Sequence, residues 1–279
     1  MTALISVIVA TYNRPDALDA VLRSLSRQDD RNFEVIVADD GSRPDTAAVI
    51  ETWKDRLSHR VVHVWHPDDG FRLAEIRNRA VRAAAGDYCI FLDGDCIARP
   101  HFVGTHRELA EFGWFVTGNR LLLSKTLSER ILRERLQPEL WTLKNWWTLR
   151  RAGEIKRLAP LASLSLGPLR RLRRHDWRGA QGCNLGIWRT DLFAVDGFEG
   201  AFSSWGREDS DILIRLMHAG LRRKDGRMAT GVLHLWHAEA DRSRLRENER
   251  LLGEVIASDR VKAVKGLSAL SDEPVVAVS

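Results

Sequence analysis

The chain has 279 residues, of which 44% are hydrophobic and 29% charged, with 43 Lys and Arg against 38 Asp and Glu. This composition supplies enough apolar material for a folded core and excludes a mainly disordered chain. No stretch approaches the roughly 20 apolar residues that span a bilayer, and the N-terminus lacks the basic leader of a signal peptide. The three cysteines include no CxxC pair, which indicates neither a disulfide scaffold nor a zinc ribbon. We therefore expect a globular protein of a reducing cytoplasm.

Apolar runs typical of strands alternate with amphipathic stretches over the first half of the chain. Residues 4–10 form a continuous apolar run, as expected of a strand buried on both faces. A helix is predicted from Pro15, because apolar residues then recur at helical spacing. Further strands are predicted at residues 33–38, 61–65 and 88–92, with an alanine-rich helix at residues 74–85. This order predicts an α/β fold with a mostly parallel central sheet flanked by helices.

Polar clusters follow three of these predicted strands. Residues 11–14 follow the first strand, Asp39 and Asp40 follow the second, and residues 93–95 follow the fourth. In parallel sheets, ligands bind beyond the carboxyl ends of the strands. Each cluster alone would be an ordinary solvated turn, but three at one edge of one sheet predict a single binding site.

A basic segment, residues 120–174, interrupts the alternation. It contains fourteen Lys and Arg against four Glu, a local balance of +10, which leaves −5 for the rest because the whole chain carries +5. Its composition favours helix, and Trp141, Trp146 and Trp147 lie among Leu and Arg. Such a segment indicates an anionic partner, which would be phosphates, nucleic acid or a membrane surface. The alternative is a solvated helix pair packed on the domain.

One candidate metal-binding motif stands after the fourth predicted strand. Phosphate-loop, GxGxxG and GxSxG motifs are absent from the sequence, which removes the usual support for nucleotide hydrolysis, hydride transfer and serine hydrolysis. The sequence does contain Asp93-Gly94-Asp95. Two carboxylates at this spacing can hold Mg²⁺ or Mn²⁺, ions that also take diphosphate oxygens as ligands. Alone the signal is weak, because such pairs also occur in ordinary turns.

A second candidate motif opens a predicted helix in the second half of the chain. It runs from Trp205 and Gly206 to the acidic residues Glu208, Asp209 and Asp211. Acidic residues at a helix start are favoured by the helix dipole, so capping is the alternative to catalysis. Trp205 and Gly206 resemble a sugar-stacking platform, although the indole can equally belong to the core.

Two histidines, His234 and His237, lie in a third candidate motif. On a strand the side chains alternate, so these two would point to opposite faces. If the run is extended throughout, one histidine can bind a given metal and the other is a bystander. A lone histidine is more often an ordinary hydrogen-bonded side chain than a ligand.

These motifs together resemble a known enzyme family. In order they are VIVATYNR at residues 7–14, VADDGS at 37–42, AEIRN at 74–78 and FLDGD at 91–95, and they look like the opening of family 2 glycosyltransferases with the GT-A fold. The second half, with GCN at 182–184, GF at 197–198, WGRED at 205–209 and His237, is similar to the galactosyltransferase-like part of that superfamily. Bacterial chondroitin-polymerase domains and β1,4-galactosyltransferases share this part. The resemblance covers roughly residues 3–118 and 179–240, and the basic segment between them matches nothing we can place.

The resemblance implies roles for individual residues. It places the nucleotide sugar on Thr11, Tyr12, Asn13, Arg14, Asp40, Arg77 and Asp93, with Asp40 at the base. It places a Mn²⁺ or Mg²⁺ ion on Asp95 and His237, with Asp93 in contact with both the metal and the ribose. It makes Asp209 the catalytic base, and the acceptor pocket is then lined by Trp205, Glu208 and Asn184. Gly94 is expected to leave room without supplying a contact, and whether His234 is a second imidazole ligand stays open.

One continuous GT-A domain with four parts is implied. Residues 1–118 are the nucleotide-sugar half, 119–178 a basic, Trp-containing helical insertion, 179–240 the acceptor and catalytic half, and 241–279 a charged helix and tail. The implied reaction is metal-dependent, inverting transfer of a sugar from a UDP-sugar to a glycan or glycolipid acceptor of the bacterial surface, such as polysaccharide or lipopolysaccharide. An inverting transfer needs a carboxylate to take the acceptor proton and a cation beside the departing diphosphate.

Two alternatives and a membrane role accompany this prediction. The chain could instead be a nucleic-acid-binding protein that uses the basic segment, or a catalytically inactive, sugar-binding relative. For the basic segment we expect contact with an anionic membrane on the cytoplasmic face, with the three Trp at interfacial depth. The residues expected to face the headgroups are Arg130, Arg133, Lys144, Arg150, Arg151, Arg170, Arg171, Arg173 and Arg174.

Overall fold

A computed structural model describes residues 3–202, 204, 206–238 and 243–271. Its strands are β1 Ile5–Thr11, β2 Phe33–Asp39, β3 Val61–Trp65, β4 Tyr88–Asp93, β5 Cys96–Ile97, β6 Trp114–Thr117, β7 Arg120–Leu122, β8 Asn184–Trp188, β9 Arg222–Asp225 and β10 Val232–His234. Its α-helices are α1 Pro15–Leu25, α2 Pro44–Arg56, α3 Leu73–Ala83, α4 Phe102–Leu109, α5 Lys125–Arg133, α6 Leu143–Arg151, α7 Arg189–Ala194, α8 Glu208–His218 and α9 Leu245–Ile256. Short 3₁₀ helices lie at Pro138–Leu140, Ala159–Leu161, Gly167–Arg171 and Leu267–Ala269.

Seven strands form the central sheet in the order β3-β2-β1-β4-β8-β6-β9. The first four run parallel, and their register places Thr11 opposite Asp39 and Ala10 opposite Asp93. β8 runs antiparallel to both of its neighbours, whereas β9 is parallel to β6. The prediction of a mostly parallel central sheet is therefore confirmed.

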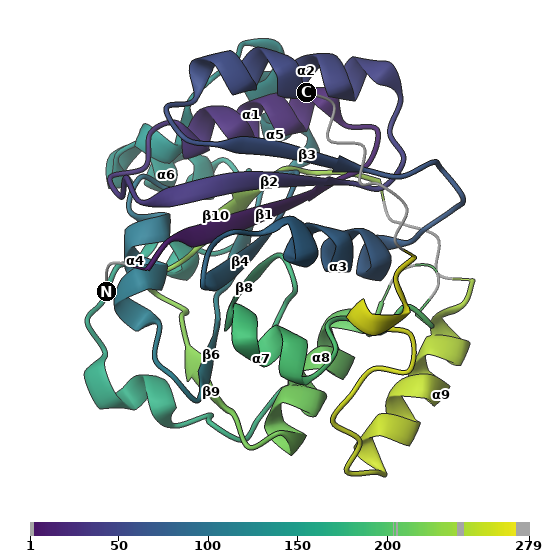
Figure 1. Ribbon diagram of the computed structural model, residues 1–279. Coiled ribbons are helices and arrows are strands. Elements are labelled where there is room, and N and C mark those ends of the chain that lie inside the picture. Colours follow the sequence, from purple (N-terminus) through teal and green to yellow (C-terminus); the bar gives the residue numbers. More distant parts are fainter. Residues whose placement is uncertain (1–2, 203, 205, 239–242, 272–279) are drawn as a thin grey trace.

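Helices cover both faces of this sheet, with α1 and α2 on one side and α3, α7 and α8 on the other (Figure 1). β1 and β2 are buried along their whole length, which explains their unbroken apolar sequence. On one face Leu18 and Ile50 pack into the core, and on the other face Ile76 and Ile212 do so. This layering leaves the carboxyl ends of the parallel strands as the edge at which polar residues collect.

A small second sheet, in the order β5-β10-β7, brings distant parts of the chain together. β10 pairs antiparallel with β5 and parallel with β7, and its last residue, His234, lies opposite Cys96 and Leu122. The segment that follows Asp95 is therefore bonded directly to the segment that carries the two histidines.

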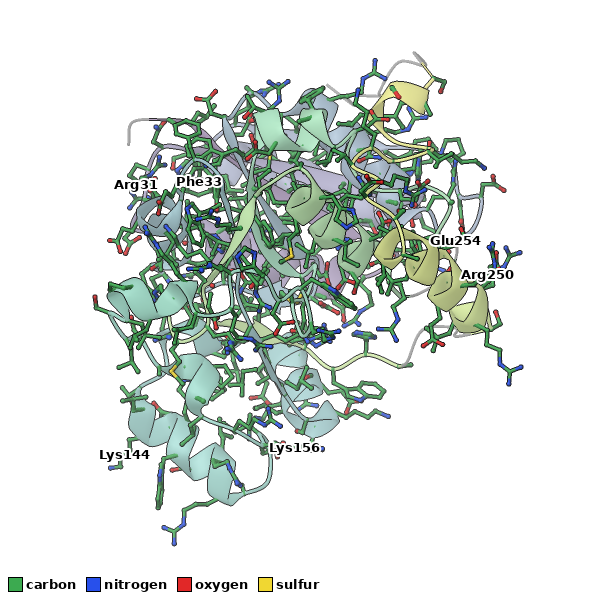
Figure 2. All side chains as sticks on the ribbon, turned by 90° about the horizontal axis from the view of Figure 1, so that it is seen from below. Arg31, Phe33, Lys144, Lys156, Arg250 and Glu254 are labelled. Atoms are coloured by element: carbon green, nitrogen blue, oxygen red, sulfur yellow. The ribbon has the colours of Figure 1, made fainter. Side chains whose placement is uncertain are left out.

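The basic segment forms α5 and α6 but also supplies β7 to the small sheet. Trp146 is buried in the core and contacts Trp141 at a ring-centroid distance of 5.2 Å, whereas Trp147 is exposed. The expectation that all three indoles face a membrane is wrong for Trp146, because the core covers its ring. Figure 2 shows α6, with Lys144 in its first turn, at the margin of the molecule.

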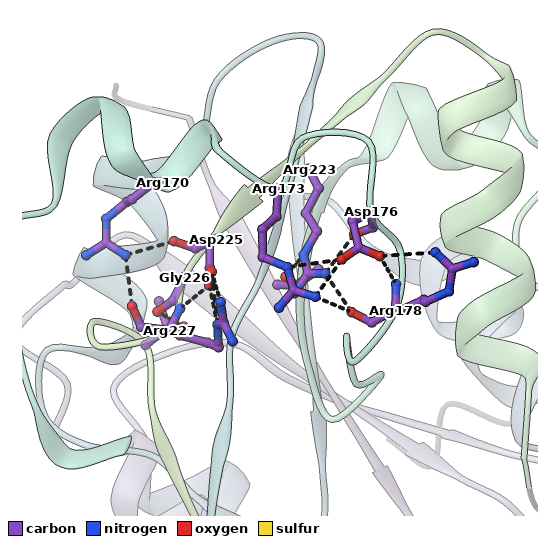
Figure 3. Close-up of polar contacts among 10 residues, drawn as sticks. Arg170, Arg173, Asp176, Arg178, Arg223, Asp225, Gly226 and Arg227 are labelled. Carbon is purple, nitrogen blue, oxygen red and sulfur yellow. Dashed lines mark hydrogen bonds and ion pairs between the residues drawn. The ribbon is translucent and has the colours of Figure 1, made fainter. Parts of the chain in front are cut away.

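Arginines at the end of the basic segment have internal partners (Figure 3). Arg170 is buried and donates to the backbone carbonyls of Asp225 at 2.8 Å and Arg227 at 3.0 Å. Arg171 and Arg173 each form an ion pair with a carboxylate. The expectation that Arg170 faces lipid headgroups is therefore wrong, since its guanidinium ties two loops together.

Helix α9 packs on α8. Leu252 and Val255 of α9 form a small core with Ile214 of α8. The side-chain amide of Asn248 on α9 donates to the carbonyl of Gly206 at 2.9 Å, just before α8 begins. None of the described helices is both long enough and apolar enough to cross a membrane.

Candidate active site

The residues predicted to hold a nucleotide lie at the ends of β1 and β2. Thr11 is buried, and among the described residues its hydroxyl has no hydrogen-bond partner. Tyr12 is half exposed, and its hydroxyl donates to Asp68 at 2.9 Å. Asn13 has a left-handed backbone (φ 49°), and its side-chain oxygen accepts the backbone N–H of Arg43 at 3.0 Å. The turn after β1 is thus tied to the turn after β2.

Asp40 is buried and has fixed partners on both carboxylate oxygens. One oxygen lies 2.7 Å from Nε2 of His66, and the other accepts the backbone N–H of Arg72 at 3.0 Å. Asp39 pairs in the same way with His63 of β3, at 2.9 Å. Sequence reasoning missed both histidines, because their pairing with Asp39 and Asp40 depends on the register between β2 and β3.

Gly94 packs closely against β1. Its N–H donates to the carbonyl of Ala10 at 2.6 Å, and a Cβ built on it would lie 2.8 Å from that oxygen and 3.0 Å from the Thr11 side chain. The expectation that this glycine leaves room is therefore wrong, because the backbones meet there. Because residue 94 is a glycine, the tight turn that carries Asp93 and Asp95 can pack directly against the end of β1.

Three metal-ligating side chains converge beside this turn. Nε2 of His234 lies 3.6 Å from one oxygen of Asp95, and Nε2 of His237 lies 3.5 Å from the other. One ligand atom from each of the three residues lies within 4.8 Å of the others. The condition under which one histidine would be a bystander is not met, because β10 ends at His234 and strand alternation no longer applies beyond it.

The protonation of this group is shaped by burial. Desolvation lowers the pKa of His234, which favours the neutral imidazole that binds metals. Desolvation also raises the pKa of Asp95, and the two neighbouring histidines oppose that shift. One carboxylate and two imidazoles form a donor set that fits a divalent transition-metal ion.

Asp93 lies outside this group of three, although its charge acts on both Asp95 and His234. Its carboxylate accepts from Nη2 of Arg77 at 3.0 Å and lies within 4.8 Å of the thiols of Cys96 and Cys183. Burial raises the pKa of the Cys96 thiol well above its usual range, which favours the neutral thiol at that position. Arg120 Nη1 lies 3.8 Å from the sulfur of Cys183, a basic neighbour that sequence reasoning missed. In this arrangement Asp93 is held by Arg77 and is not one of the three converging ligands.

Arg77 of α3 connects the donor side with the start of α8. It is buried, bonds Asp93, and lies 3.7 Å from the carboxylate of Glu208. Burial, and then the neighbouring Asp209 carboxylate, raises the pKa of Glu208 to about 7, while Arg77 opposes that shift. Arg14, also assigned to the nucleotide, forms an ion pair with Asp16 at the start of α1, and its charge acts on Asp95.

Asp209 lies in the first turn of α8, facing the turn before β8. One carboxylate oxygen accepts the N–H of Gly182 at 3.1 Å, and the other accepts the N–H of Ser210 at 2.7 Å. Arg207 before it has a left-handed backbone (φ 81°) and makes no side-chain cap. Among the described residues, capping contacts at this helix start are the Ser210 N–H bond to Asp209 and a backbone bond to the carboxylate of Glu208. Trp205 lies outside the described residues.

Asn184 is placed in the interior. Its amide donates to the carbonyls of Asn119 at 3.1 Å and Thr230 at 2.5 Å, and its oxygen lies 3.0 Å from Nε2 of His106. The side chain is fully buried. The assignment of Asn184 to the acceptor pocket does not fit this position, because its amide joins β8 to two loops.

Two family models together match residues 6–238 of the chain. The model described as glycosyl transferase family 2 matches residues 6–174. A second model, described as the N-terminal domain of galactosyltransferase, matches residues 172–238. The two matches meet at the end of the basic segment and agree with the resemblance carried by the motifs.

Curated relatives agree with these models. The chain is 30% identical over 240 residues to validoxylamine A glucosyltransferase of Streptomyces hygroscopicus subsp. jinggangensis, covering 82% of this chain and 55% of that protein. It is 27% identical over 241 residues to chondroitin synthase of Escherichia coli, covering 81% of this chain and 34% of that protein. The chain thus spans about half, or less, of the length of these relatives.

Solved glycosyltransferases share the fold. TarS of S. aureus superposes with a TM-score of 0.62 at 17% identity, covering 91% of this chain and 40% of that one. The Pyrobaculum calidifontis mannosyltransferase PcManGT with GDP-Man and Mn²⁺ gives 0.60 at 17% identity, covering 92% and 65%. TarS with UDP-GlcNAc gives 0.57 at 16% identity, covering 91% and 66%. With this GT-A fold, and with a family model that matches more than half of its length, the chain belongs to the family 2 glycosyltransferases.

Proposed function

We propose that this protein transfers a sugar, with inversion, from a UDP-sugar to a hydroxyl of a glycan or glycolipid acceptor. The observation that carries the proposal is the convergence of Asp95, His234 and His237 at one strand-end edge, with Arg77 linking that edge to the start of α8. Asp209 follows Glu208 at the start of α8, and the acceptor would lie between that helix start and the converging ligands.

The donor would occupy the turns after β1 and β2. Thr11 offers a buried hydroxyl, Tyr12 an exposed ring, and Asp40 a carboxylate held in place by His66. A solved structural neighbour was crystallised with UDP-GlcNAc, which supports a UDP-sugar as the donor. The hexose itself is left to experiment, because it depends on a few loop contacts.

A divalent cation would be held by Asp95, His234 and His237. Such an ion, when bound, neutralises charge on the departing diphosphate. Two imidazoles favour Mn²⁺ over Mg²⁺, which prefers oxygen ligands. A neighbour solved with GDP-Man and Mn²⁺ supports this choice.

Asp209 would act as the general base. The acceptor oxygen bonds to the anomeric carbon, its proton passes to a carboxylate oxygen of Asp209, and the bond from that carbon to the diphosphate oxygen breaks. Glu208 would hold the acceptor, since its pKa of about 7 leaves it partly protonated and able to donate to a sugar oxygen. Arg77 would keep Glu208 and Asp93 in fixed positions.

We further propose that the enzyme acts in the cytoplasm and that its product is a cell-surface polysaccharide or lipopolysaccharide. The three cysteines are buried and free, which suits a reducing compartment. The names of the relatives support glycan products, since one of them is a chondroitin synthase.

The proposal is tested with a panel of UDP-linked Gal, Glc, GalNAc, GlcNAc and GlcA. We expect one of them to raise the thermal unfolding temperature with Mn²⁺ and much less without it, because the ion and the diphosphate bind together. The same sugar nucleotide should be hydrolysed slowly in the absence of acceptor. Equal responses to all five with and without metal would contradict a metal-dependent UDP-sugar site.

A further inference from the structure

The exposed side of α6 combines apolar and basic side chains. Leu143 and Trp147, four residues apart, are exposed by 72% and 54%. Lys144, Arg150 and Arg151 lie beside them and are also exposed. Exposed leucine and tryptophan beside basic residues are typical of a helix that lies on a membrane surface.

No acidic residue balances these charges locally. Residues 140–153 contain neither Asp nor Glu. Glu139 just before them is buried, and Glu154 just after them bonds Ser124. Among the described residues, Lys144 and Arg150 form no ion pair, so their charges stay available to a partner.

The helix is held firmly in this orientation. Thr142 caps its first turn with Asn145 in a reciprocal capping box. Trp146 on the opposite side is buried in the core, and Leu149 packs against the same core. The exposed side is therefore a fixed surface, which Figure 2 shows at the margin of the molecule near Lys144.

We propose that this surface docks on an anionic lipid bilayer. Leu143 and Trp147 would enter the headgroup region, and Lys144, Arg150 and Arg151 would contact lipid phosphates. A soluble polyanion would be attracted by the charges but would gain nothing from exposed leucines. The combination of both favours the bilayer.

The exposed side of α6 is connected to the candidate site through the chain. The docking proposal therefore deepens the proposed function, and it rests on that function for the nature of the acceptor. Just after α6, Ile155 forms a bridge with Leu123, whose N–H donates to the carbonyl of His234 at 3.0 Å. In α5, Ser128 accepts the N–H of Trp236 at 2.8 Å. Docking through α6 would thus bring a lipid-linked acceptor to the side of the molecule that carries the histidines.

The test is co-sedimentation of the whole chain with phosphatidylcholine vesicles, with and without phosphatidylglycerol. We expect binding only to the anionic vesicles, with release at high salt. Changing Lys144, Arg150 and Arg151 together to Ser should lower partitioning about 100-fold, because each basic side chain near an anionic surface contributes about fivefold. Changing Leu143 and Trp147 together to Ser should lower it at least tenfold, since buried apolar area also contributes.

Matched controls separate this surface from general charge and hydrophobicity. The charge control removes the same three positive charges from other exposed positions, by changing Arg31, Arg56 and Lys262 together to Ser. The apolar control removes exposed apolar side chains elsewhere, by changing Ile256 and Val264 together to Ser. Both controls should bind as the unaltered protein does. Equal binding to neutral and anionic vesicles, no binding, or equal losses in the controls would overturn the proposal.

A polyanion as the true partner is a further outcome. The bilayer assignment would be overturned by two results together. The protein would bind no vesicles, and it would bind dextran sulfate equally well with and without the change of Leu143 and Trp147 to Ser. Mn²⁺-dependent UDP affinity, measured in solution on the same variants, should not change. If the unaltered protein itself did not bind UDP, that result would instead count against the proposed function.

Discussion

At the scale of single residues, the candidate metal group depends on where β10 ends. His234 is the last residue of the strand, and His237 follows three residues later on irregular backbone. That break allows both imidazoles to approach Asp95 from different sides, at 3.6 and 3.5 Å. Gly94 has a similar local importance, because its missing Cβ lets the turn that carries Asp95 touch β1.

We predict that His234→Gln lowers Mn²⁺ affinity in the presence of UDP by at least 100-fold. Loss of a hydrogen-bond partner behind a metal ligand already costs about 10–100-fold, and this variant loses a ligand. Calorimetric titration of Mn²⁺ measures the effect, with thermal unfolding as a check on the fold. His175→Gln, at an exposed position in the basic segment, is the control and should bind as before. Unchanged affinity in His234→Gln would show that His234 is only packed there.

At the scale of elements, α9 supports the start of the helix that carries the candidate base. Asn248 is fully buried and bonds the carbonyl of Gly206. Gly206 and Arg207 both have positive φ, a conformation that local sequence does not favour at Arg207. The contact from α9 therefore fixes a backbone bend that sets the direction of Glu208 and Asp209.

We predict that Asn248→Ala raises the acceptor KM and lowers kcat about tenfold, with UDP affinity unchanged. Losing this buried bond costs about 1–3 kcal/mol and frees the bend before Asp209. Leu252→Ala is the control, because Leu252 packs between α9 and α8 without bonding the bend and its loss costs about 2–5 kcal/mol. If both variants changed the kinetics equally, Asn248 would matter only for stability.

At the scale of the whole molecule, the sequence predicted secondary structure best where the pattern of apolar side chains matched the burial of the strand. The apolar runs of β1, β2, β3 and β4 predicted the parallel half of the sheet, since strands buried on both faces need continuous hydrophobicity. β8 was not predicted from its own sequence, because a five-residue strand followed at once by a helix has little periodicity. The small sheet depends on pairings between β5, β7 and β10, which are distant in sequence.

The candidate site was predictable in part for the same reason. Strand ends located Asp40 and Asp95, and the helix start located Asp209. The burial of Asn184 and Arg170 depends on partners from other loops, so their internal roles were not visible in local sequence. The pairing of Asp40 with His66 follows from the register between β2 and β3, which local patterns do not specify.

The central claim is that Asp209 takes the acceptor proton in a sugar transfer, and steady-state turnover of Asp209→Asn tests it most directly. The change keeps the shape of the side chain and removes its basicity, so turnover with the sugar nucleotide chosen by the panel should fall by about 10²–10⁴-fold. UDP affinity should stay the same, because Asp209 contacts Gly182 and Ser210 and none of the three converging ligands. Near-normal turnover in Asp209→Asn, with a large loss in Glu208→Gln, would contradict the account and make Glu208 the base.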